Sequence, residues 1–379
     1  MVDTDSMSRR LDAVIDRALA EKRVVGAVVL VAQRGKVVFS RAAGHANREA
    51  RIPMSAGTVF RLSSLTKPIV SAAAMALIER GKLGLDDEVT RWLPAFRPKL
   101  PDGSTPAITV RQLLTHTAGL GYRFNTPAGS PYHPAEISDG LDESPVTLEE
   151  NVRRLGAVPL LYAPGTSWVY SLAIDVLGAV LEKAAGAPLA DVVSQRITAP
   201  LAMPDTAFYC REPDRLAVPY VDGKPEPVLM GDPVVVTFMD SAIRFSPSRA
   251  SNPRAYASGG VGMVGTGDDF MRFLLALLAG GGPVLRPGTV TTMMSNQIGS
   301  IPTLRGPGFA FGFGGAVITD PAAAQTPQSP GTFSWGGVYG HSWFVDPRKE
   351  VALLCMTNTA FEGMIGTITT QLRDAVYQD

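Results

Sequence analysis

The sequence predicts an α+β protein, in which an α/β domain with a central antiparallel sheet flanked by helices accompanies a mostly helical domain. Runs of β-forming residues lie near both ends of the 379-residue chain, whereas the middle shows helical patterns. We expect residues 1–80 and 240–379 to build the domain with the sheet, and residues 81–239 to form the helical domain. A cleft between two such domains is the natural place for a binding or active site.

The amino-terminal part of the chain predicts a helix followed by a β-hairpin. Apolar residues recur at helical spacing over residues 8–22, and charged residues occupy the other face. Two runs rich in β-forming residues follow, Val24–Gln33 and Lys36–Ala43, and the Arg-Gly pair between them is typical of a tight turn. The next apolar run predicts a helix over residues 64–81 that ends at a glycine.

Four helices are predicted in the segment that follows. Two of them begin at capping boxes, in which a threonine is followed three residues later by Gln or Glu. The four predicted ranges are Val110–His116, Leu148–Leu155, Ala173–Ala185 and Asp268–Ala279. Residues 121–146 are rich in Gly, Pro, Ser and Asp and show no periodicity, so we expect a long surface loop there.

The carboxyl-terminal part predicts three strands and a last helix. The strands cover Phe309–Ile318, His341–Asp346 and Glu350–Thr357, and the helix spans about Met364 to Tyr377. Because β-rich segments lie at both ends of the chain, we expect one antiparallel sheet to be built from both termini.

Composition excludes several classes of protein. A hydrophobic content of 45% with 18% charged residues is ordinary for a globular chain and excludes disorder. The 35 basic and 35 acidic residues balance, so we expect neither nucleic acid nor a membrane as a partner. The amino terminus lacks the apolar stretch of a secretory signal, and we expect a cytoplasmic protein. None of the four histidines has metal-ligand spacing to another, so we expect no metal and no cofactor.

A serine and a lysine stand three residues apart at the head of the helix predicted over residues 64–81. Residues i and i+3 share a helical face, so the Ser64 hydroxyl and the Lys67 ammonium should be neighbours. Pro68 is acceptable there because an N–H in the first turn of a helix has no intrahelical partner. Free N–H groups and the positive end of the helix dipole can stabilise a developing oxyanion. This arrangement can build a nucleophile without a Ser-His-Asp triad.

Two further segments carry residues that suit the same chemistry. Tyr170 lies just before a predicted helix, and an adjacent lysine ammonium would stabilise its phenolate and allow it to take a proton from a serine. Taken alone, Tyr170 is more often a core aromatic. Trp335 is followed by Gly336 and Gly337 at the edge of a strand, where glycines permit close approach of backbone to a ligand, although a bulge or turn is the simpler interpretation.

Two polar residues near these segments are expected to have structural roles. His341 closely follows the Trp-Gly-Gly segment, and we expect a hydrogen-bonded structural histidine. Asp175 lies one turn after Ser171, and we expect a solvated carboxylate near the start of a helix, with a hydrogen bond to the site as the alternative.

In chain order, these three segments resemble the motifs of the serine β-lactamase and penicillin-binding-protein superfamily: Ser-x-x-Lys, Tyr-x-Asn and Lys-Thr-Gly. The segments 113–120 and 164–165 are similar to those of the class C branch, and the resemblance extends over nearly the whole chain. It is closest to the family VIII carboxylesterases, which keep the class C fold but hydrolyse esters and carry Trp-Gly-Gly as the third motif. No Gly-x-Ser-x-Gly elbow occurs, so an ordinary α/β-hydrolase is not expected.

The resemblance implies a role for each residue of the site. Ser64 would be the nucleophile that forms an acyl-enzyme, Tyr170 the general base and then the proton donor, and Lys67 the group that lowers the pKa of the tyrosine. The backbone N–H groups of Ser64 and Val338 would form the oxyanion hole. The substrate pocket would be lined by Trp335, Gly336, Gly337, Tyr122 and Leu172.

Two departures from the β-lactamase pattern bear on the substrate. Leu172 replaces the asparagine of the second motif and cannot hydrogen-bond a substrate amide, and Trp335 replaces the lysine that helps to bind a carboxylate. Both changes favour a neutral, apolar ester, provided that no arginine has taken over from the lysine.

We therefore expect a serine esterase for short acyl esters, with the acetyl ester of cephalosporins among the candidate substrates. A β-lactamase, peptidase, amidase or acyltransferase that uses the same residues is the alternative. A protein that is acylated without turnover is a third hypothesis, and the complete set of Ser, Lys and Tyr argues against it. The sequence leaves a monomer and a homo-oligomer open.

Overall fold

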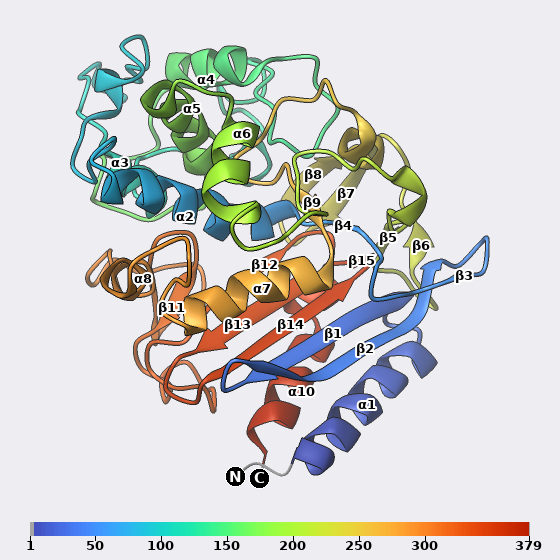
Figure 1. Cartoon of the computed structure of the whole chain (residues 1–379). Helices are drawn as coiled ribbons and strands as arrows, with labels where there is room; N and C mark the ends of the chain where they lie inside the picture. Colours follow the sequence, from blue (N-terminus) through green and yellow to red (C-terminus); the bar gives the residue numbers. More distant parts are fainter. Residues whose placement is uncertain (1–3, 379) are drawn as a thin grey trace.

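The structure is a computed structural model that describes residues 4–378. Its central feature is an eight-stranded antiparallel sheet in which strands from the two ends of the chain lie side by side (Figure 1). In spatial order the strands are β10 (Phe309–Phe311), β11 (Ala316–Ile318), β12 (Phe333–Gly337), β13 (His341–Asp346), β14 (Val351–Thr357), β1 (Gly26–Gln33), β2 (Lys36–Asn47) and β3 (Ile52–Pro53). β1 pairs with β14 from Ala27 opposite Thr357 to Gln33 opposite Val351, so the predicted sheet built from both termini is confirmed.

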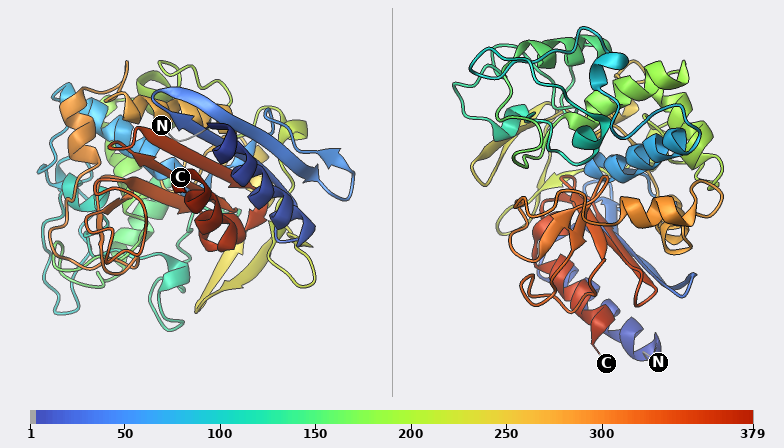
Figure 2. Two further views of the ribbon diagram at one scale, coloured as in Figure 1. Left: turned by 90° about the horizontal axis from the view of Figure 1, so that it is seen from below. Right: turned by 90° about the vertical axis from the view of Figure 1, so that its left-hand side faces the viewer.

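One face of the sheet is covered by the two terminal helices, α1 (Thr4–Ala20) and α10 (Thr367–Tyr377), with the short α9 (Glu362–Ile365) preceding α10. Seen from below in Figure 2, α1 and α10 lie next to each other against the strands. Apolar side chains of α1 form one buried face with alternate residues of β1, such as Val29 and Val31. Their neighbours Val28 and Leu30 point to the opposite core, as the two-residue period of a strand requires.

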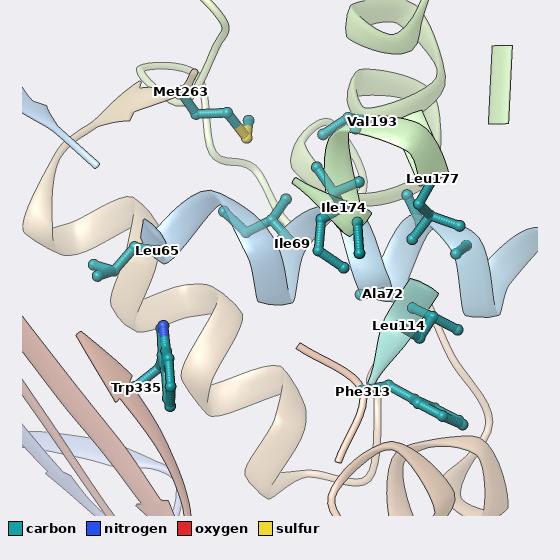
Figure 3. Packing of buried hydrophobic residues seen from close by; sticks show 14 of the residues in the cluster. Leu65, Ile69, Ala72, Leu114, Ile174, Leu177, Val193, Met263, Phe313 and Trp335 are labelled. Atoms are coloured by element: carbon teal, nitrogen blue, oxygen red, sulfur yellow. The ribbon is translucent and has the colours of Figure 1, made fainter. Parts of the chain in front are cut away.

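The other face of the sheet packs against α7 (Gly267–Leu278), which lies across the strands in Figure 1. The short helix α8 (Pro287–Met293) lies beside α7 (Figure 1). Beyond them lie α2 (Thr66–Glu79) and the helices that surround it, which are α3 (Val110–Leu114), α4 (Leu148–Ala157), α5 (Ala173–Ala185) and α6 (Leu189–Val193). α2 is buried almost all round, and Figure 3 shows Ile69 and Ala72 of α2 near Ile174 and Leu177 of α5. A helix that is apolar on every side belongs inside a protein, so the Ser-x-x-Lys segment is held at the centre of the molecule.

Three small sheets complete the fold. They pair β15 (Thr359–Ala360) with β5 (Tyr220–Val221) and β6 (Val228–Leu229), β4 (Phe60–Arg61) with β9 (Val264–Gly265), and β7 (Val234–Phe238) with β8 (Ser241–Phe245). Single turns of 3₁₀ or π-helix lie at Ser63–Leu65, Val89–Arg91, Arg123–Asn125, Ser194–Thr198, Pro213–Arg215 and Pro247–Ser251. No helix within residues 4–378 is long and apolar enough to cross a membrane.

Several predicted elements are confirmed, and others are wrong. The predicted ranges of α5 and β13 match the structure, and the Thr109 capping box is formed with Gln112. The single strand expected over Phe309–Ile318 is wrong, because the chain reverses at Gly312–Gly315 to form the β10–β11 hairpin. The loop at 121–146 holds only one 3₁₀ turn, but it is not simply a surface loop: Tyr122, Tyr132 and Ile137 are buried in it. The β7–β8 hairpin was not predicted. The division into domains stays a prediction.

Candidate active site

Ser64 lies in a strained turn that precedes α2. The residue before it, Ser63, has a φ of 45°, in the left-handed region that costs a residue with a side chain about 1–3 kcal/mol. The end of β12 presses against this turn, because a Cβ on Gly337 would lie 2.5 Å from the Ser63 Oγ and 2.8 Å from the Leu62 carbonyl oxygen. Only a glycine leaves room for this approach. The third motif therefore positions the turn that carries Ser64.

Lys67 contacts Ser64 as the i, i+3 spacing predicts. Its Nζ donates to the Ser64 Oγ over 3.3 Å and to the Gly260 carbonyl oxygen over 2.9 Å, and its side chain is fully buried. Burial disfavours the ammonium and lowers the pKa of Lys67 to about 7, although the negative charge of Asp175 acts in the opposite direction. Lys67 therefore loses its proton more readily than a lysine in water, and its neutral amine can accept a proton.

Tyr170 approaches Ser64 from the helical side of the molecule. Its hydroxyl donates to the Ser64 Oγ over 2.7 Å and accepts a hydrogen bond of 3.2 Å from the Trp335 Nε1, and Lys67 Nζ lies 4.4 Å from the centre of its ring. Figure 3 shows the indole nitrogen of Trp335 at the end of the ring that points towards α2. Burial raises the pKa of Tyr170, and the hydrogen bonds with Ser64 and Trp335 offset only part of this effect. The expected lowering of this pKa by Lys67 stays a prediction.

Asp175 is a buried member of the site rather than a solvated carboxylate. It accepts a hydrogen bond of 2.6 Å from the Ser258 hydroxyl, and burial raises its pKa to about 6. Its second oxygen and the Tyr122 hydroxyl are buried with no hydrogen-bond partner among residues 4–378. Both surround Gly260, where a Cβ would lie 2.6 Å from the Asp175 Oδ2, 2.9 Å from the Tyr122 hydroxyl and 3.5 Å from the Lys67 Nζ. The default interpretation of Asp175 as a solvated carboxylate is therefore wrong, and Gly260 was missed, although the pair Gly259-Gly260 was a sequence signal for it.

The residues expected to line the substrate pocket divide into two groups. Trp335 is 7% exposed and Ser64 is 4% exposed, so both retain some access to solvent. Tyr122 and Leu172 are fully buried: Tyr122 stands behind Lys67 and Tyr170, and Leu172 immediately precedes α5. Gly336 allows tight packing of backbone, since its Cβ would lie 2.9 Å from the His341 carbonyl oxygen. Gly336, like Gly337, therefore shapes the strand rather than presenting a side chain to a substrate.

The two histidines near the site are structural. His341 Nε2 lies 2.8 Å from the Arg61 carbonyl oxygen, and burial lowers its pKa to about 4, so the expected structural histidine is confirmed. His116 accepts from the Ser171 N–H at its Nδ1 over 3.3 Å, and its ring centre lies 4.9 Å from that of Tyr170. Burial holds the pKa of His116 well below its ordinary value. Both rings are therefore neutral at physiological pH.

The oxyanion hole stays a prediction. Val338 follows directly on β12, whose end contacts the turn that carries Ser64. The arrangement brings the two predicted N–H donors, those of Ser64 and Val338, into the same part of the molecule.

Comparison with known proteins decides the family. The family model for beta-lactamases matches residues 11–378, which is nearly the whole chain. The chain belongs to the beta-lactamase family. It is 53% identical to the esterase EstB of Burkholderia gladioli over 380 residues, covering 99% of this chain and 96% of EstB.

Two solved structures show the same fold. EstCE1, described as a hydrolase with promiscuous acyltransferase activity, superposes with a TM-score of 0.98 at 48% identity over the full length of both chains. A variant of simvastatin synthase from Aspergillus terreus superposes with a TM-score of 0.77 at 23% identity, covering 98% of this chain and 97% of that one. The predicted β-lactamase-like fold is thereby confirmed.

Proposed function

We propose that this protein is a serine carboxylesterase that hydrolyses short-chain acyl esters through an acyl-enzyme on Ser64. The observation that carries the proposal is the convergence of two proton-handling groups on one hydroxyl: Tyr170 at 2.7 Å and Lys67 at 3.3 Å from the Ser64 Oγ. Such a serine can be activated without a histidine. The 53% identity to an esterase over the whole chain supports an ester as the substrate.

In the acylation step, the Ser64 Oγ attacks the ester carbonyl carbon while the Ser64 proton passes to neutral Lys67. The directions of the pKa shifts favour this route over the Tyr170 base implied by the family resemblance, because burial lowers the pKa of Lys67 and raises that of Tyr170. The C–O bond to the alcohol then breaks, and the Tyr170 hydroxyl gives its proton to the departing alkoxide. The Lys67 ammonium and the Trp335 N–H stabilise the phenolate left behind until Lys67 returns the proton.

Deacylation uses the same groups with water as the nucleophile. Water attacks the acyl carbonyl carbon and its proton passes to Lys67. The bond between the acyl carbon and the Ser64 Oγ breaks, and Tyr170 protonates Oγ. Lys67 then restores the Tyr170 proton, which returns every group to its starting state.

The surroundings of Ser64 support a short, apolar acyl group. The rings of His116, Trp168 and Trp335 pack against Tyr170, and Phe311 packs against Trp168 and Trp335. These side chains are buried or nearly so, and they give the surroundings of Tyr170 an aromatic, largely apolar character.

The test is turnover of 4-nitrophenyl butyrate by the purified protein and two variants. Ser64→Ala removes the nucleophile and Tyr170→Phe removes the proton donor, and we expect each to lower kcat by at least about a thousandfold. Ser104→Ala, at an exposed loop residue, and Tyr209→Phe, outside the site, are the matched controls and should retain activity. Butyrate release by Ser64→Ala at the rate of the unaltered protein would refute the proposal.

Acyl transfer is a second candidate activity, because EstCE1, at 48% identity, is described as a hydrolase with promiscuous acyltransferase activity. It needs no new residue, since an alcohol takes the place of water in the second step. Addition of benzyl alcohol to the same assay should then yield benzyl butyrate, whereas a pure hydrolase yields butyrate alone. A chromogenic cephalosporin, assayed in parallel, distinguishes the esterase from a β-lactamase, and we expect little ring opening.

A further inference from the structure

An arginine stands over the tryptophan that replaces the family's carboxylate-binding lysine. Arg305 belongs to the segment between α8 and β10, far from the three motifs in sequence. Its guanidinium carbon lies 5.1 Å from the centre of the Trp335 ring and 5.9 Å from that of Phe309. A cation from another segment therefore lies against the tryptophan of the third motif.

The charge of Arg305 is not neutralised by the protein. Its guanidinium makes no ion pair and no hydrogen bond with residues 4–378, and only its backbone N–H donates, to the Thr303 hydroxyl. Neighbouring protein desolvates the guanidinium and lowers the pKa of Arg305, but an arginine remains charged at any physiological pH. The residue as a whole is exposed to solvent, although neighbouring protein lies close to its guanidinium.

Trp335 connects this cation directly to the reacting groups. The ring beneath the guanidinium donates its N–H to the Tyr170 hydroxyl over 3.2 Å, and Tyr170 donates to the Ser64 Oγ over 2.7 Å. Arg305 is thus one aromatic ring away from the group that handles the leaving alcohol.

We propose that Arg305 is a specificity-determining residue that binds the carboxylate of acid-bearing esters, with Trp335 as the platform that orients the guanidinium. The inference rests on the proposed esterase function and adds the substrate class. A guanidinium matches the planar geometry of a carboxylate and can donate two parallel hydrogen bonds to it. The expectation of a strictly neutral substrate is replaced by an ester with an apolar acyl pocket and an anionic tail.

The test compares matched esters that differ only in a carboxylate and a carboxamide. One pair places the group on the alcohol, as 4-acetoxyphenylacetate and 4-acetoxyphenylacetamide, and the other places it on the acyl chain, as the 4-nitrophenyl monoesters of adipate and adipamate. The readout is the ratio of kcat/KM for the acid to that for the amide. Arg305→Met keeps an apolar side chain on Trp335 but removes the charge. Arg305→Lys keeps the charge but removes the planar guanidinium that can donate two parallel hydrogen bonds.

For at least one pair we expect Arg305→Met to lower the ratio about fivefold to tenfold, mainly through KM, and Arg305→Lys to lower it less. Loss of packing on Trp335 acts on both members of a pair alike and cancels in the ratio. Arg348→Met, in the exposed turn at the opposite end of β13 from His341, is the control and should leave the ratio unchanged. Raising the salt concentration should shrink the ratio of the unaltered protein.

An Arg305→Met ratio equal to that of the unaltered protein for both pairs would overturn the inference while leaving the esterase function intact. An equal fall in kcat/KM for the acid and the amide in Arg305→Met would also overturn the inference, because it would show that Arg305 only packs on Trp335. If the protein hydrolyses none of the four esters, the proposed function is refuted, and the inference with it.

Discussion

Lys67 meets two opposing requirements within one buried side chain. Removal from water favours its neutral amine, whereas the carboxylate of Asp175 favours the ammonium, and the first effect is larger. The result is a base poised near neutral pH instead of near pH 10. Tyr170 is affected in the other direction, because burial raises its pKa and keeps its proton on the phenol. Burial thus shifts the two pKa values in opposite directions, which makes Lys67 a proton acceptor and Tyr170 a proton donor.

This separation predicts the pH dependence of the reaction. Lys67 must be neutral to accept the Ser64 proton, so kcat/KM for a neutral ester should rise with pH, with a midpoint near 7, and then level off. No fall is expected below about pH 10, the ordinary pKa of a tyrosine, because the Tyr170 phenol keeps its proton there. Asp175→Asn removes the negative charge that raises the pKa of Lys67, so the midpoint should move to lower pH.

Initial rates between pH 5 and 9 measure both effects, with Asp268→Asn, an exposed residue near the start of α7, as the matched control. A purely structural role for Asp175 would lower the activity at every pH without moving the midpoint. A midpoint that moved to higher pH in Asp175→Asn would contradict the assignment of Lys67 as the base.

At the scale of the element, the active site depends on how closely β12 approaches the turn before α2. Gly337→Ala would bring a methyl group to 2.5 Å from the Ser63 Oγ and 2.8 Å from the Leu62 carbonyl oxygen, so the strand and the turn must separate. Because a displacement of about 1 Å can cost a hundredfold in rate, we expect kcat to fall by about that factor. Gly288→Ala, where a Cβ meets nothing within 4 Å in α8, is the control. Equal kcat in the two variants would show that the contact with β12 does not position Ser64.

Among the helices and strands, some could be predicted from the sequence and others could not. The ranges of α5 and β13 were predictable because an uninterrupted apolar pattern and clear flanking residues define them locally. The β10–β11 hairpin was misread as one strand because apolar residues continue on both sides of its glycine turn. The β7–β8 hairpin turns at Met239, whose φ of 51° is unusual for methionine, so no Asn-Gly or Asp-Gly signal marks it.

The active site was predictable where its residues share a short motif. Ser64 and Lys67 are neighbours through helix geometry alone, and the order of the three motifs added Tyr170 and Trp335. Asp175, Gly260 and Arg305 reach the site only through tertiary packing. Single residues of this kind have no spacing to recognise, and their pKa shifts depend on burial that a sequence does not display.

At the scale of the whole molecule, strands from both ends of the chain pair at the centre of the sheet, and both terminal helices cover one of its faces. The core between α1, α10 and the strands is separate from the core around α2, in which the active site lies. Stability and catalysis are therefore expected to respond to different residues. Leu372 is fully buried in the first core, and its helix α10 lies on the opposite side of the sheet from α2 (Figure 1).

Leu372→Ala should destabilise the protein without changing the chemistry. Loss of a buried leucine side chain typically costs about 2–5 kcal/mol, from the lost burial and the cavity that remains. We therefore expect a clear fall in Tm by calorimetry, with kcat/KM for 4-nitrophenyl butyrate preserved at temperatures where the variant is folded. Leu304→Ala, at an exposed leucine, is the control and should leave the Tm nearly unchanged. A loss of kcat/KM in folded Leu372→Ala would mean that the terminal helices help to set the geometry at Ser64, because the strands between the two cores would then transmit the change.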